Sequence, residues 1–156
     1  MNLTEETDLL RNIPMFSSLE PSKLKLLAFT SEMLKYDDKE ILFHIGDSAD
    51  SAYVIMDGEV NVLIDIEDGT MDTLTLYKNQ LIGEMALLNN APRLATLVAK
   101  GPLTLLKITD KVFNTLLLEN PDFAMDVMRQ LTQKLALAHE RIKSLESELF
   151  LKTQSH

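Results

Sequence analysis

The 156-residue chain contains no cysteine and no tryptophan. Without cysteine it can form no disulfide, no thiolate nucleophile and no cysteine-ligated zinc or iron–sulfur site. Its three histidines, His44, His139 and His156, are far apart in sequence and lack the spacing of a metal site. The sequence also offers no Ser/His/Asp or paired-acid arrangement. We therefore expect no metal, no cofactor and no catalytic residues.

Long apolar runs are absent as well. No stretch approaches the roughly 18 consecutive apolar residues that cross a bilayer, and the opening MNLTEETDLLRNIP carries acids where a secretory signal carries bases. These features predict a cytoplasmic protein. Because 46% of the residues are hydrophobic, the chain can bury one sizeable core, and we expect a single domain over residues 1–156.

Basic residues are scarce too. The formal net charge is −9, and residues 1–128 hold 21 acidic side chains against 10 basic ones. A surface this acidic repels DNA and anionic membranes. We therefore expect no direct contact with nucleic acid or membrane, and any phosphate that the chain binds has to be held by local groups.

Hydrophobic periodicity divides the chain into three parts. Residues 1–36 have helical patterns. Residues 37–109 consist of short β-type runs separated by turn signals, and Asp57-Gly58 is the strongest hairpin signal among them. Residues 110–156 return to a helical period. Many short, evenly spaced strands favour an antiparallel sandwich, roll or barrel, here with flanking helices.

The long helix predicted over residues 122–152 contains a heptad repeat. Its apolar residues are spaced 4, 3, 4, 3 and 4 positions apart, namely Leu131, Leu135, Ala138, Ile142, Leu145 and Leu149. Such a seam is typical of a coiled coil. We expect a parallel homodimer in which Arg141 of one chain faces Glu146 of the other. The alternative is that the stripe packs on the body of its own chain.

One pair of opposite charges lies in the otherwise apolar or neutral stretch GEMALLNNAPRLAT, residues 83–96. An unpaired cation in an apolar segment is costly, so Arg93 needs an anion. Gly83 permits close approach of the backbone, and the free N–H groups of a short helix favour an anion that an arginine can grip with two donors. Glu84, an acceptor when ionised, suits a hydroxyl. The stretch therefore indicates a ligand with a phosphate beside a hydroxyl; the alternative is an internal salt bridge between Arg93 and Glu84.

Four stretches resemble the cyclic-nucleotide-binding domain family, which is found in the bacterial catabolite activator, protein kinase regulatory subunits and cyclic-nucleotide-gated channels. They are LLRNIPMFSSLEP, ILFHIGDSADSAYVIMDGEVNV, IGEMALLNNAPRLATLVA and LENPDFAMDVMRQLTQKL. The third is similar to the family's phosphate-binding cassette, which would span residues 82–96. The resemblance implies an antiparallel β-roll, jelly-roll-like, with N-terminal helices, a short phosphate-binding helix and a long C-terminal helix.

The resemblance also implies roles for individual residues. Arg93 would clamp the exocyclic phosphate, and Glu84 would accept the ribose 2′-hydroxyl. Backbone groups would complete the phosphate and ribose shell at Gly83, Met85, Ala86 and Leu94. In many members the residue at the position of Leu94 is small or bears a hydroxyl, and a Thr or Ser there often helps to hold guanine, so cGMP is a less expected ligand than cAMP. His139 is a possible base contact by its position on the long helix; the alternative is that it is an exposed coiled-coil residue.

The function implied is that of a non-enzymatic cyclic-nucleotide receptor. Ligand binding would repack the C-terminal helix and act on an unknown effector protein. Two alternatives remain at this point: a dimeric interaction module of the same fold that binds no nucleotide, or the sensor half of a truncated transcription regulator. The second arises because only KTQSH follows Leu151, where the family's transcription factors continue into a winged helix-turn-helix.

Overall fold

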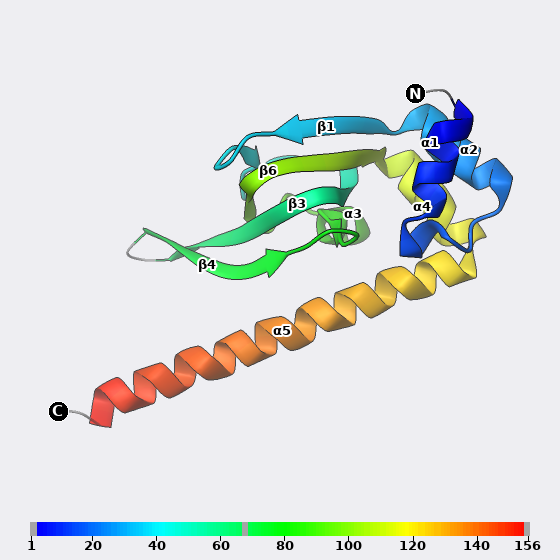
Figure 1. Cartoon of the computed structure of the whole chain (residues 1–156). Helices are drawn as coiled ribbons and strands as arrows, with labels where there is room; N and C mark the ends of the chain where they lie inside the picture. Colours follow the sequence, from blue (N-terminus) through cyan, green and yellow to red (C-terminus); the bar gives the residue numbers. More distant parts are fainter. Residues whose placement is uncertain (1–2, 67–68, 155–156) are drawn as a thin grey trace.

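The computed structural model describes residues 3–66 and 69–154 and has the expected architecture of an antiparallel sheet with flanking helices (Figure 1). The N-terminal helical segments are α1 (Leu3–Arg11), the 3-10 turn η1 (Pro14–Phe16) and α2 (Pro21–Thr30). The strands are β1 (Glu32–Tyr36), β2 (Ile41–Phe43), β3 (Ser51–Ile66), β4 (Gly69–Leu76), β5 (Leu81–Ile82) and β6 (Thr96–Thr109). The remaining helices are α3 (Glu84–Asn89), α4 (Asp110–Glu119) and α5 (Pro121–Gln154).

Two long strands, β3 and β6, form the centre of the sheet. They pair antiparallel from Ser51 opposite Thr109 to Leu63 opposite Thr96. The strand order is β1-β6-β3-β4, and β2 adds to β6 while β5 adds to β3. Every neighbour of these two strands is also antiparallel.

The hairpin predicted at Asp57-Gly58 is wrong, because β3 runs straight through it. The register of β3 against β6 shifts on both sides of Asp57, which marks a β-bulge. Gly58 has a φ of +99°, and a Cβ there would lie 2.4 Å from the carbonyl oxygen of Pro102 in β6. A bulge and a tight turn both use a glycine at positive φ, so the local signal is the same. Here it bends two paired strands, which helps the sheet to curl into a roll.

The helical boundary predicted at residue 36 is also wrong, because residues 32–36 form the edge strand β1. Helix α2 ends at Thr30, and Ser31 is already extended while its backbone N–H donates to the carbonyl of Leu27. The run EMLKY is too short to show a period, and pairing with β6 over Leu103–Lys107 decides its conformation.

Alternate side chains of β3 enter two different hydrophobic clusters, as the period of a strand requires. Ala52 and Val54 pack with the helices, and Tyr53 and Ile55 point into the roll. The helical cluster includes Phe16, Leu24, Phe113, Leu116, Phe123 and Val127. The cluster inside the roll includes Val60, Leu76, Ile82, Leu97, Ala99 and Leu105.

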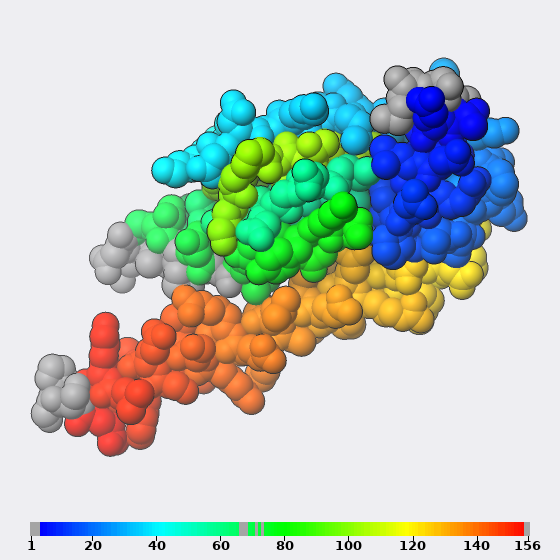
Figure 2. Space-filling view, in the orientation of Figure 1, coloured from blue at the N-terminus to red at the C-terminus, as the bar shows by residue number. Residues whose placement is uncertain are grey.

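Helix α5 packs on the helical cluster through its first third, with Phe123, Val127 and the partly buried Leu131. The Phe123 ring packs against Phe16 and Phe113 at centroid distances of 6.0 and 6.2 Å. The helix then runs past β4, and its second half diverges from the roll toward the C-terminus (Figures 1 and 2). Within the described ranges, none of the helices is both long and apolar enough for a bilayer crossing.

Candidate functional site

The predicted cassette, residues 82–96, begins at the last residue of β5 and turns at Gly83. This glycine has a φ of +75° and turns the chain into the six-residue helix α3. Asn90, also left-handed with a φ of +49°, ends the helix. The chain then reaches Arg93, whose backbone N–H donates to the carbonyl of Asp47 and whose carbonyl accepts from the N–H of Gly46, both at 2.8 Å. These bonds hold the backbone of Arg93 against the loop after β2.

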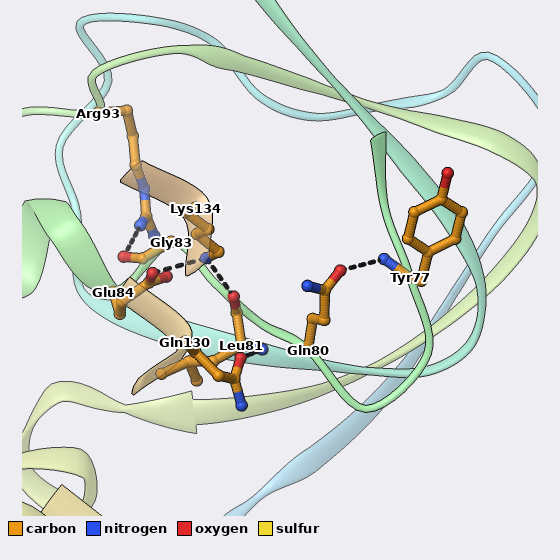
Figure 3. Close-up of polar contacts among 8 residues, drawn as sticks. All are labelled: Tyr77, Gln80, Leu81, Gly83, Glu84, Arg93, Gln130 and Lys134. Atoms are coloured by element: carbon orange, nitrogen blue, oxygen red, sulfur yellow. Dashed lines mark hydrogen bonds and ion pairs between the residues drawn. The ribbon is translucent and has the colours of Figure 1, made fainter. Parts of the chain in front are cut away.

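The six cassette residues that the sequence singles out all line one cavity. Its volume is about 110 Å³. The polar lining groups come from Gly83, Glu84, Arg93 and Lys134, which lie near one another in Figure 3. The rest of the lining is apolar and consists of Phe43, Val62, Leu74, Leu76, Ile82, Met85, Ala86, Leu94, Ala95 and Leu97. The cavity therefore has a small charged region next to a larger apolar one.

Arg93 is a buried cation, 4% exposed, that is bonded to neutral groups. Its Nη1 donates to the carbonyl of Gly83 and its Nη2 to the carbonyl of Ser51, both at 2.8 Å. The guanidinium carbon lies 4.1 Å from the centroid of the Phe43 ring, in the range of a cation–π contact. Burial lowers the pKa of Arg93 from its ordinary value, although nearby acids and Tyr53 act in the opposite direction.

The alternative of a salt bridge between Arg93 and Glu84 is wrong. Within residues 3–66 and 69–154, no carboxylate forms an ion pair with Arg93, and its buried Nε has no hydrogen-bond partner. A buried polar atom without a partner is uncommon and calls for an explanation. The guanidinium therefore has both charge and donor capacity to offer to an anion in the cavity.

Glu84 is 1% exposed, and its partner is a residue that the sequence did not single out. Lys134 of α5, 5% exposed, places its Nζ 2.6 Å from Glu84 Oε1 and 2.5 Å from the carbonyl oxygen of Leu81 (Figure 3). One turn earlier, Gln130 Oε1 accepts from the Leu81 N–H at 2.7 Å. The spacing of Val127, Leu131 and Lys134 is compatible with a lysine on the buried face of the helix, but the same position also fits the solvated side of a coiled coil, so the sequence does not decide between them.

The remaining predicted residues fall in different places. Met85 and Leu94 line the cavity but are partly open to solvent, and their side chains offer only apolar contact. His139 is exposed on α5 and is not among the cavity-lining residues, so its contact with a base stays a prediction. Among the residues that the structure describes, no group of three His, Asp or Glu side chains could hold a metal ion.

Comparison with known proteins agrees with this geometry. The family model described as "Cyclic nucleotide-binding domain" matches residues 33–120. A cAMP-dependent protein kinase regulatory subunit of Blastocladiella emersonii is 35% identical over 125 residues, which are 80% of this chain and 30% of that protein. The cAMP-activated global transcriptional regulator of Pasteurella multocida is 34% identical over 113 residues, 71% of this chain and 54% of that protein.

A solved structure is similar as well. The regulatory domain of Toxoplasma gondii PKA with cAMP superimposes with a TM-score of 0.63 at 26% identity, covering 72% of this chain and 43% of that one. The present chain spans only about a third to a half of the length of these relatives. Since the family model covers more than half of the chain and contains the whole cassette, the chain belongs to the cyclic-nucleotide-binding domain family.

Proposed function

We propose that the chain is a receptor for a cyclic nucleotide, with cAMP favoured over cGMP, and that the nucleotide binds in the cavity beside α3. The observation that carries this proposal is Arg93, a buried guanidinium with carbonyl partners, a free Nε and no carboxylate partner among the described residues. A cation held in this way stabilises a bound phosphate without first having to give up a salt bridge. The similarity to a regulatory domain solved with cAMP supports the same ligand class.

The two charged side chains would recognise different parts of the ligand. Arg93 would donate to the cyclic phosphate, and Glu84, an acceptor when ionised, would accept from the ribose 2′-hydroxyl. The apolar wall around Val62, Leu76 and Leu94 would contact the base. Since these three side chains offer a base no hydrogen bond, guanine gains no polar contact from them, and this is our reason for favouring cAMP.

The output would pass through α5 to an effector protein that is still unknown. Helix α5 contacts the cassette through the bond from Lys134 to Glu84, and the strand before it through the bond between Gln130 and Leu81, so closure of α3 over a ligand would change how α5 packs. In such a two-state element the ligand shifts the equilibrium by its difference in affinity for the two states. We propose no catalytic step, because the family whose model matches is a binding domain.

We also propose that two copies associate through α5. The seam residues Leu131, Ala138 and Leu145 are half-buried in the single chain. The seam residues between them are more exposed, with exposed fractions of 70% for Leu135, 54% for Ile142 and 66% for Leu149. Three large aliphatic side chains repeating every seven residues on a projecting helix match the seam of a coiled coil. The Arg141–Glu146 pair across the dimer remains a prediction of this register.

Thermal unfolding distinguishes a receptor from an interaction module that binds no nucleotide. A ligand bound only to the folded state at 100 times its Kd adds about 2.7 kcal/mol of stability, which raises the midpoint of a domain of this size by roughly 5–10 °C. We expect that rise with cAMP and not with adenosine, which has the base and ribose but no phosphate. No rise with millimolar cAMP or cGMP would favour the interaction module instead.

A further inference from the structure

Lys134 is an unusual residue to find in a ligand cavity, because it arrives from the long C-terminal helix and is almost completely buried. Its Nζ donates to both Glu84 Oε1 and the carbonyl of Leu81. A single buried ion is strongly destabilising, whereas an ion pair with further hydrogen bonds is tolerated. Since Arg93 is bonded to carbonyls instead, Lys134 is the cation that balances the charge of Glu84.

Two side chains of α5 bond to the turn that connects β5 to α3. Lys134 bonds to Leu81 and Glu84, which stand at the two ends of the turn from β5 into α3. Gln130, four residues earlier on the same helix face, accepts from the Leu81 N–H. The two side chains therefore attach α5 to the turn at three atoms and orient the carboxylate of Glu84 (Figure 3).

An ionised carboxylate has about four lone-pair sites on its two oxygens, so the bond from Lys134 leaves acceptor capacity for a ligand hydroxyl. We infer that Lys134 is a positioning residue, which orients the carboxylate of Glu84 so that the cavity recognises the ribose 2′-hydroxyl only while α5 is docked. This inference rests on the proposed function. Because coupling is reciprocal, a ligand that carries the hydroxyl also stabilises the docking of α5.

The test compares cAMP with 2′-deoxy-cAMP by calorimetric titration. A hydrogen bond to a charged group corresponds to roughly 10- to 100-fold in affinity, and we expect the wild type to prefer cAMP by that factor. In Lys134→Met the preference should fall to within about threefold, while the affinity for 2′-deoxy-cAMP changes little because Arg93 is intact. Lys134→Arg should restore much of the preference, and Lys143→Met, an exposed lysine of the same helix, should leave it unchanged.

A second measurement uses the wild type alone, in case Lys134→Met does not fold. At saturation, cAMP should slow amide hydrogen exchange around Gln130 and Lys134 more than 2′-deoxy-cAMP does. Equal protection by both ligands, or a Lys134→Met protein that keeps the full preference for cAMP, would overturn the role of Lys134 and leave the proposed function standing. A wild type that binds neither nucleotide would instead remove the proposed function itself, and the inference with it.

Discussion

Replacing Gly83 by alanine separates two roles that this residue has, one in the backbone and one in the placement of Arg93. Gly83 has a φ of +75°, and a Cβ there would lie 2.7 Å from Nη1 of Arg93. Gly101 in β6 provides a matched control, since its φ is +78° but a Cβ would meet nothing within 4 Å. Both substitutions force an L-residue into the left-handed region, and only one of them disturbs the guanidinium.

The size of each effect follows from the geometry. An alanine in the left-handed region costs about 1–2 kcal/mol, so both variants should lose a similar amount of stability, seen as a drop of roughly 2–8 °C in the unfolding midpoint. A side-chain nitrogen can retreat from a new methyl group, and here it has to move by roughly 0.7 Å to regain ordinary contact. If that shift costs one hydrogen bond from the guanidinium to the phosphate, cAMP affinity falls about 10- to 100-fold in Gly83→Ala.

The assays are thermal unfolding followed by circular dichroism and calorimetric titration with cAMP, on both variants and the wild type. We expect equal loss of stability in both variants and a loss of affinity in Gly83→Ala alone. Equal cAMP affinity in the two variants would refute the reasoning, because it would mean that the position of Arg93 against Gly83 does not matter for the ligand.

Two further predictions concern the dimer and the response to alkaline pH. Ile142→Lys, at an exposed seam position, should convert the dimer to monomer in sedimentation equilibrium, whereas Ser144→Lys, off the seam, should not; a wild type that is already monomeric would contradict the seam. Burial raises the pKa of Tyr36 above its ordinary value, with smaller contributions from Tyr53, Glu40 and Glu32. The unfolded chain therefore releases this proton at a lower pH than the folded chain, so stability should fall as pH rises past about 10. In urea titrations at pH 9 to 11, Tyr36→Phe should lose less free energy of unfolding with rising pH than the wild type does. The same dependence on pH in both proteins would contradict this role of Tyr36.

The sequence alone was sufficient to group the residues from Gly83 to Leu94 that line one cavity, for a physical reason. Between Tyr53 and Ala99 the chain has only two basic residues, and one of them, Arg93, lies in an apolar segment. Because an unpaired cation there is costly, Arg93 indicates an anionic partner. Gly83 before a short helix and Arg93 after it then fall around one cavity. Local spacing is enough to group these residues because Gly83, α3 and Arg93 are contiguous in the sequence.

Lys134 could not be assigned in the same way. Its burial depends on α5 crossing the turn after β5, a contact between residues about 50 positions apart. From sequence it belongs equally well to the solvated side of a coiled coil. The hairpin prediction at Asp57-Gly58 failed for a related reason. A glycine at positive φ occurs in both a bulge and a hairpin turn, and only pairing with β6 decides between them.

The central claim is that Arg93 holds the phosphate of a cyclic nucleotide. Calorimetric titration of the wild-type chain with cAMP, alongside Arg93→Ala with its fold checked by circular dichroism, tests it most directly. We predict one cAMP per chain for the wild type and an affinity at least about 100-fold weaker for the variant, because the charge-assisted bonds to the phosphate are lost. The same affinity in both proteins, or no binding by the wild type, would contradict the claim.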